Sequence, residues 1–106
     1  MTLSIPDQME PANQLSIFFE AISKDGRIRT RHISLYMAMI RYWMGNGFQN
    51  PVPVSRSRLM KASKIASPTI YHKCIRELKE YGYIKYEPSY HPLEGSRVYL
   101  LGVLDQ

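Results

Sequence analysis

Residues 53–86 read PVSRSRLMKASKIASPTIYHKCIRELKEYGYIKY, and they carry the clearest pattern in the chain. Ser67 followed by Pro68 predicts the start of a helix, because serine caps helix N-termini and proline is tolerated at the first helical position. At about 100° per residue, four side chains of this helix share one stripe: Tyr71, Cys74, Ile75 and Leu78. We expect this stripe to be buried and the helix to stop near Gly82.

The opposite side of the same helix is polar and basic in its first half, and its acids Glu77 and Glu80 come late. The residues on that side are Thr69, His72, Lys73, Arg76 and Lys79. A helix that enters a DNA groove has this arrangement, since its N-terminal residues meet the bases and its far end leaves the duplex. An ordinary amphipathic helix with a solvated basic face is the alternative, and this helix alone does not separate the two.

A shorter helix is predicted directly upstream, over RSRLMKAS, with Ser55 or Ser57 as its cap and Leu59 and Met60 pointing inward. Lys64-Ile65-Ala66 then forms a turn before Ser67. Two helices joined by a turn of about three or four residues have the spacing of a helix-turn-helix. The motif is expected at about residues 55–82.

Two strands are predicted after the long helix, at residues 83–87 and 97–101, separated by a loop of roughly nine residues. This hairpin, at about 83–101, is interpreted as a wing, and Lys85 and Arg97 near the loop could reach phosphates. A plain hairpin that completes the core is the alternative, and both can hold because one face packs while the other is exposed. The core candidates are Ile84, Val98 and Leu100.

The first half of the chain predicts two helices and a short strand. Residues 1–11 contain two prolines and no sustained period, so a loose lead-in is expected. Residues 12–23 form a short amphipathic helix whose Phe18 and Phe19 either cap the core, which we favour, or make a subunit contact. Thr30 is the expected cap of a helix that ends at Gly45-Asn46-Gly47. Residues 50–54 could form a short edge strand, since their prolines suit only an edge.

Composition narrows the class of protein. A chain of 106 residues with 44% hydrophobic residues is long and apolar enough for one folded domain. Its single cysteine excludes an internal disulfide and suits a reducing compartment. No apolar run approaches the ~20 residues of a membrane span, and the N-terminus lacks the features of a signal peptide. We therefore expect a cytoplasmic protein without a membrane partner.

The net charge of +5 is unevenly distributed. Residues 1–26 hold four acids and one base, whereas residues 54–86 hold eight bases and two acids. Positive charge thus concentrates on the predicted helix-turn-helix, as expected for a surface that binds a polyanion.

Catalysis is not expected. His32, His72, His91 and Cys74 lie in separate elements or on different sides of one helix, without the spacing of metal ligands. The chain has no glycine-rich phosphate loop and no serine in a nucleophile-elbow pattern. Neither a cofactor nor a metal is predicted.

The order helix, short strand, helix, turn, helix, strand, wing, strand resembles the winged-helix superfamily. Leu59, Ser67-Pro68, Leu78 and Gly82-Tyr83-Ile84 carry the resemblance, which covers roughly residues 30–101. MarR-like regulators and plasmid or phage replication proteins are similar to this pattern. The run YHKCIRELKEYGYIKYEPSYHP with GSRVYL also looks like small helix-turn-helix proteins encoded on mobile elements of Bacteroidetes. The wing departs from the MarR pattern, because Tyr90, His91 and Pro92 replace that family's acidic and arginine-rich tip.

The resemblance implies a mainly α fold with a small β-hairpin, namely a winged helix-turn-helix with an extra N-terminal helix, formed by residues 12–106. It implies binding of double-stranded DNA with the second helix of the motif in the major groove. The expected role is sequence-specific, in a transcriptional regulator or mobile-element accessory factor, with a homodimer through the N-terminal helix as an option. The alternative is a protein–protein interaction module, which the hairpin tyrosines favour: Tyr83, Tyr86, Tyr90 and Tyr99.

Within that fold, chemistry assigns the site residues. Arg76 and Lys73 are candidates for a guanine edge or a phosphate, Thr69 and His72 can donate to bases or phosphates, and Ile70 could touch a thymine methyl. Backbone N–H groups from Ser67 to Thr69 suit a phosphate at the helix start. Four basic residues are expected to contact the DNA backbone and to set register: Arg56, Arg58, Lys61 and Lys64. Lys85 and Arg97 could reach phosphates on either side of the groove.

Overall fold

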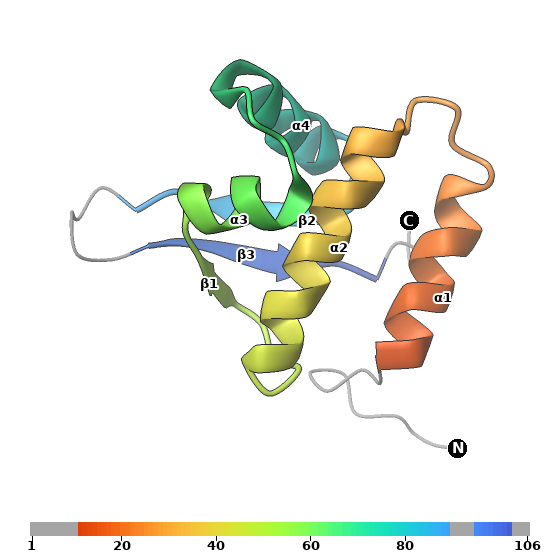
Figure 1. The fold of residues 1–106 in the computed structure, drawn as a ribbon. Helices are drawn as coiled ribbons and strands as arrows, with labels where there is room; N and C mark the ends of the chain where they lie inside the picture. The colour runs from red at the N-terminus through yellow and green to blue at the C-terminus, as the bar shows by residue number, and fades with distance from the viewer. Residues whose placement is uncertain (1–10, 90–94, 103–106) are drawn as a thin grey trace.

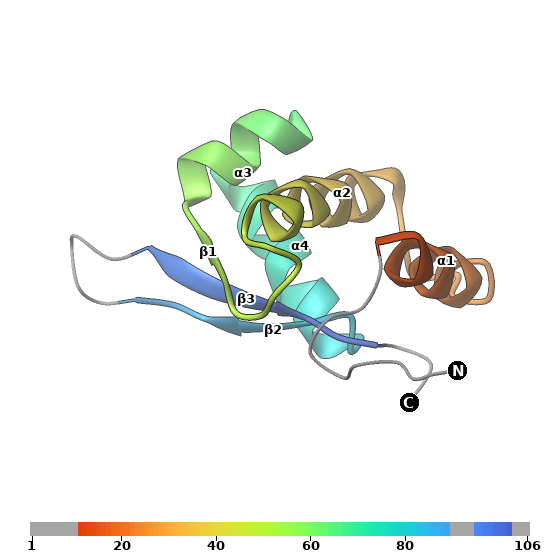
Figure 2. The same cartoon turned by 90° about the horizontal axis from the view of Figure 1, so that it is seen from below.

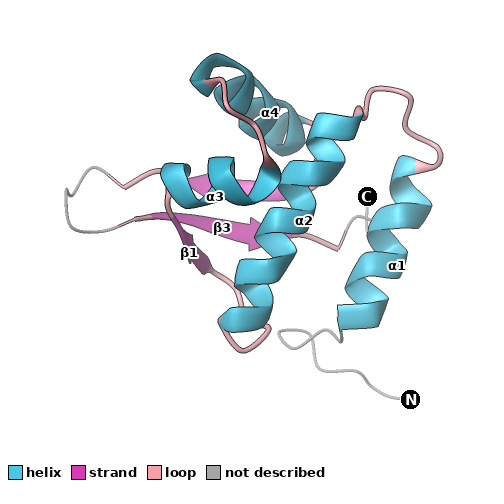
Figure 3. Cartoon of the chain, in the orientation of Figure 1, coloured by secondary structure: helices cyan, strands magenta, loops and turns pink. Residues whose placement is uncertain are grey.

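The computed structural model describes residues 11–89 and 95–102. Helix makes up most of this part of the chain, with a small antiparallel sheet beside it (Figure 3). In chain order the elements are α1 (Pro11–Ile22), α2 (Thr30–Gly45), β1 (Val52–Val54), α3 (Arg56–Ser63), α4 (Pro68–Glu80), β2 (Ile84–Glu87) and β3 (Ser96–Leu100) (Figure 1). The predicted lead-in up to residue 10 and the wing residues Tyr90, His91 and Pro92 lie outside the described residues.

The sheet has the strand order β1-β3-β2, and both pairings are antiparallel. Val52 faces Val98 across one pairing, and Ile84 faces Leu100 across the other. The expected hairpin therefore supplies two strands, β2 and β3, of a three-stranded sheet whose central strand is β3. The segment predicted as a possible edge strand does form one. Its two valines are buried while Pro53, which has no N–H to donate, is exposed.

The core lies between α2 and the sheet, with α3 and α4 closing it. Figure 2 shows α2 and α3 on one face of the sheet, with α1 beside α2 on the side away from α3. Fully buried side chains come from every layer: Leu35 and Met39 of α2, Leu59 of α3, Leu78 of α4 and Val98 of β3. None of the described helices is both long and apolar enough to cross a membrane.

The two phenylalanines of α1 have different environments. Phe18 is fully buried and stacks on Tyr36, with ring centroids 3.9 Å apart. Gln14 reinforces this contact, because its Nε2 donates to the Tyr36 hydroxyl at 2.6 Å. Phe19 is 48% exposed, so the preferred core interpretation of the pair is correct for Phe18 and wrong for Phe19.

The start of α2 differs from the prediction. Thr30 is its first helical residue, and Arg29 occupies the cap position. The backbone N–H of Arg29 donates to Nδ1 of His32 at 2.8 Å, so a buried imidazole three positions into the helix satisfies the N–H of the cap residue. The donor and acceptor residues are three positions apart, as in a capping box, where the acceptor is usually the side chain of Glu or Gln.

The predicted caps of α3 and α4 are confirmed. Ser55, not Ser57, caps α3, with its Oγ accepting from the Arg58 N–H at 3.2 Å. Ser67 Oγ accepts from the Ile70 N–H at 3.2 Å, and Pro68 opens α4. Between the helices, Lys64 adopts φ 66° and turns the chain, and buried Ile65 anchors the turn. The α3 end is also tied to α2 by the Ser34 hydroxyl, which donates to the Ser63 carbonyl.

Candidate nucleic-acid interface

Helix α4 separates its side chains as the periodicity predicts. Tyr71, Cys74, Ile75 and Leu78 are all buried. Six residues of the opposite side are exposed: Thr69, Ile70, His72, Lys73, Arg76 and Lys79. Ile70 is 41% exposed, and an apolar side chain on an otherwise polar face can contact a thymine methyl.

Of the two acids of α4, Glu80 is exposed and Glu77 is not. Arg76 Nε lies 4.0 Å from Glu80 Oε2, and both side chains are more than half exposed. Such a pair contributes little and leaves Arg76 free to rotate. Glu77 instead turns toward α2, where its Oε1 lies 2.7 Å from Nε2 of buried His32. This hydrogen bond lowers the pKa of Glu77, so the carboxylate stays charged while it points toward α2.

The start of α4 offers fewer backbone donors than the sequence suggested. Pro68 has no N–H, and the Ile70 N–H is already bonded to Ser67 Oγ. Ser67 itself is half-buried, so its side chain serves the helix cap. A phosphate at this point would rely on the Thr69 N–H and on nearby cations.

Helix α3 and its C-cap residue Lys64 carry four basic side chains. Arg56, Arg58, Lys61 and Lys64 are all exposed. Within residues 11–89 and 95–102, none of these four side chains forms an ion pair with an acidic residue. An anion that approaches α3 therefore meets cations that need no prior separation from a carboxylate.

The cations of the hairpin are in a different state. Lys85 and Arg97 are exposed, but both pair with Glu87, at 3.5 Å each. Lys85 Nζ also lies 4.9 Å from the centre of the Tyr99 ring. Ile84, Val98 and Leu100 are buried, so the hairpin does complete the core.

The tyrosines that favoured a protein-docking hairpin are largely engaged within the fold. Tyr83 is buried, and its hydroxyl donates to Asp25 at 2.8 Å. The Tyr86 hydroxyl donates to Ser96 Oγ at 2.9 Å, and the Tyr99 hydroxyl reaches Glu87. Tyr90 lies outside the described residues. Of the four hairpin tyrosines, Tyr83 is therefore too buried to contact a partner protein.

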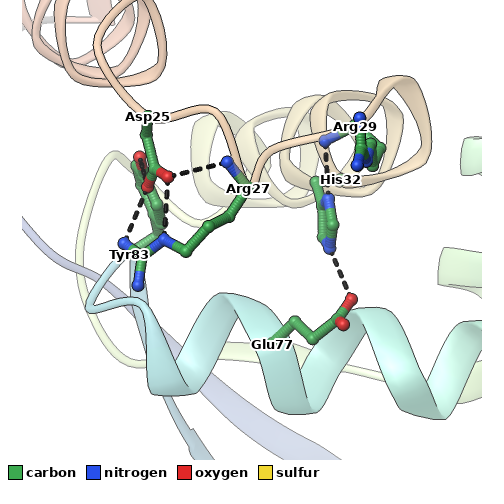
Figure 4. A network of polar contacts seen from close by, with 6 residues as sticks. All are labelled: Asp25, Arg27, Arg29, His32, Glu77 and Tyr83. Carbon is green, nitrogen blue, oxygen red and sulfur yellow. Dashed lines mark hydrogen bonds and ion pairs between the residues drawn. The ribbon is translucent and has the colours of Figure 1, made fainter.

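A polar network that the sequence did not reveal holds the C-terminal part of α4 in place (Figure 4). Asp25, in the α1–α2 loop, accepts from Arg27 Nε at 2.8 Å and Nη2 at 2.9 Å. The Arg27 guanidinium also lies 4.0 Å from the centre of the Tyr81 ring, just after α4. The hydrogen bond from Arg27, more than that from Tyr83, holds the pKa of Asp25 well below its usual range. Local charge patterns alone do not indicate this link between the loop and α4.

The thiol of Cys74 belongs to the packed apolar stripe of α4. Cys74 is fully buried, and burial raises the pKa of its thiol. Among the described residues, no three His, Cys, Asp or Glu side chains are grouped so that they could hold a metal ion.

Comparison of the chain with known families, proteins and structures gives no match. No family model matches the chain, and neither the curated proteins nor the solved structures give a significant match.

Proposed function

We propose that this chain is a winged helix-turn-helix protein that binds double-stranded DNA sequence-specifically, with α4 in the major groove. The observation that carries the proposal is the division of α4 into a buried apolar stripe and an exposed face of DNA-compatible side chains. Thr69, Ile70, His72 and Lys73 occupy the first half of that face, and all four are exposed. An α-helix with side chains is about 10–12 Å across, and the major groove is about 12 Å wide.

Five of the six exposed side chains have a base edge or a phosphate of matching chemistry as a partner. Arg76 can donate twice to guanine O6 and N7, Lys73 can donate to the same atoms or to a phosphate, and Ile70 can pack on a thymine methyl. Thr69 and His72 can donate to base edges or to phosphates. Specificity would come from these contacts, whereas the phosphate contacts would position the helix.

The four unpaired cations of α3 support a duplex as the ligand. Arg56, Arg58, Lys61 and Lys64 flank α4 in sequence and have no acidic partner among the described residues. Phosphate contacts by such residues release counterions from DNA and supply affinity that does not depend on sequence. The biological setting would be a transcriptional regulator or a mobile-element accessory factor, since both need this binding activity.

A homodimer through α1 fits the exposed Phe19, which would be covered in such an assembly. The protein-interaction alternative is less well supported, because Tyr83 is buried and Tyr86 and Tyr99 make hydrogen bonds within the fold.

The test is selection of bound sequences from random duplex DNA, followed by affinity measurement at several salt concentrations. We expect one enriched motif, and two inverted copies of it if the chain binds as a dimer. The affinity should fall steeply between about 50 and 200 mM salt, because counterion release drives binding. Absence of an enriched motif together with a flat salt dependence would contradict the proposal.

A further inference from the structure

An open groove of about 630 Å³ runs between α2 and α3. Its lining residues are Arg41, Tyr42, Arg58, Lys61, Ala62 and Lys64. Four of these six carry positive charge, and none comes from α4 or from the β2–β3 hairpin. The groove is therefore built separately from the surface assigned to base contacts.

The charges in this groove are not neutralised by the part of the chain that the structure describes. Arg41, like the three cations of α3, forms no ion pair with an acidic residue of residues 11–89 or 95–102. This contrasts with Lys85 and Arg97 of the hairpin, which share Glu87. Like charges that line one groove repel each other, so binding of an anion between them relieves the repulsion.

The walls of the groove are held in place by the core. Leu35 and Met39 of α2 and Leu59 of α3 are fully buried in the core that these two helices share. The hydroxyl of Ser34 bonds the carbonyl of Ser63, which fixes the end of α3 against α2. Because the two backbones cannot separate without breaking these contacts, the backbone positions that carry the four cations are fixed relative to one another.

We propose that Arg41 extends the phosphate contacts of Arg58, Lys61 and Lys64 into the α2–α3 groove, and that this groove holds nucleic-acid backbone phosphates other than those beside α4. The identity of the polyanion rests on the proposed function, whereas the groove and its charges do not. The phosphates belong either to a flanking segment of the duplex bound by α4 or to a separate duplex.

Substitution of Arg41 tests this groove separately from the neighbouring surface. Lys61 and Lys64 also line a second hollow with Ser57, Met60, Ile65 and Ala66, so changes to either lysine affect two surfaces. Arg41 is exposed on α2 and lines only the first groove of the two. Arg41→Glu reverses its charge, and Lys24→Glu on the α1–α2 loop makes the same change in net charge far from the groove as a control.

The experiment measures binding of each variant to the selected motif in a duplex of about 10 base pairs, one helical turn, and in one of about 30 base pairs. If the groove holds flanking phosphates, Arg41→Glu weakens binding to the long duplex alone and lowers its salt slope by about 0.9 or more. If the groove holds a separate duplex, the wild type saturates with two short duplexes per chain and Arg41→Glu with one.

Two further outcomes would contradict phosphate binding in the groove. One is that Arg41→Glu and Lys24→Glu behave alike on both duplexes. The other is that Arg41→Glu weakens both duplexes equally at unchanged stoichiometry, which makes Arg41 part of the α4 contact surface. A wild-type chain that binds neither duplex contradicts the proposed function instead and removes nucleic acid as the ligand. Thermal unfolding of both variants checks that the fold is retained.

Discussion

The Nε2 atom of His32 lies 2.7 Å from Oε1 of Glu77, and this contact joins the start of α2 to α4. The other ring nitrogen, Nδ1, accepts from the Arg29 N–H at 2.8 Å, so it carries no proton. Nε2 must therefore hold the ring proton and donate it to Glu77, which assigns the neutral tautomer. One buried side chain thus caps α2 and sets the position of α4 against it (Figure 4).

Loss of the Glu77 acceptor should destabilise the fold. Glu77→Ala leaves the Nε2–H of buried His32 without a partner, so we expect a loss of about 1–3 kcal/mol in the free energy of unfolding. Glu77→Gln keeps a carbonyl oxygen at the same reach and should cost about 1 kcal/mol or less. Urea unfolding at neutral pH measures both. Equal losses in the two variants would show that the acceptor itself contributes nothing.

Acid should weaken the link between Asp25 and Arg27. The folded-state pKa of Asp25 lies below its unfolded value, so the carboxylate stabilises the fold fully above the unfolded value. That stabilisation is lost progressively as the pH falls below about 4. Glu77, whose pKa is also lowered, adds to the loss with the same sign.

The control for this pH dependence is Asp25→Asn, which cannot titrate. We expect the variant to be less stable than the wild type at pH 7 and to lose less stability on acidification. The measurement is the free energy of urea unfolding from pH 7 down to pH 2. Parallel curves for the two proteins would exclude Asp25 as a source of the acid sensitivity.

Base reading and phosphate binding should separate in two variants. Arg76→Ala should cost about 1–3 kcal/mol on the preferred duplex and much less on random DNA, because it removes a bidentate base contact. Lys61→Ala should weaken binding to both DNAs alike. Fluorescence anisotropy with both duplexes provides the comparison. If Arg76→Ala also weakens both equally, Arg76 contacts only phosphate.

Neutralising Glu87 should show whether the β2–β3 hairpin, the proposed wing, takes part in binding. Glu87 pairs with both Lys85 and Arg97, whose side chains are each 60% exposed. Glu87→Gln releases the two cations, so affinity for duplex DNA should rise and the salt slope should steepen by about 0.9 per new phosphate contact. An unchanged slope would place the wing away from the DNA. The matched control is Glu20→Gln, which removes the same charge and frees Lys24 in the acidic N-terminal part of the chain.

Gly95 should not tolerate a side chain. A Cβ atom at this position would lie 2.5 Å from the carbonyl oxygen of Val54, in the strand paired with β3. Gly95→Ala must therefore shift β1 from β3, and we expect a loss of about 1–3 kcal/mol in the free energy of unfolding. Gly26→Ala, which meets nothing within 4 Å, is the control for urea unfolding. Equal stability of the two variants would contradict the close approach seen here.

The helices and their exposed faces were predictable because they depend on residues close together in the chain. Ser55 and Ser67 each cap a helix through an N–H three positions away, and the buried stripe of α4 follows from the helical period. The exposed α4 residues and the basic side chains of α3 therefore lie where periodicity placed them. Their binding role stays a prediction.

Contacts between distant residues were decided only on folding. His32 and Glu77 are 45 positions apart, and no local pattern indicates that one acid of α4 turns inward to meet an imidazole. The same holds for the burial of Phe18 and not Phe19, and for the central place of β3 in the sheet. It also holds for the position of Arg41 in the wall of the α2–α3 groove. Side-chain period and capping act over one helical turn, whereas these features depend on how whole elements pack. Such packing depends on the shapes of all partners at once, which one segment read alone does not specify.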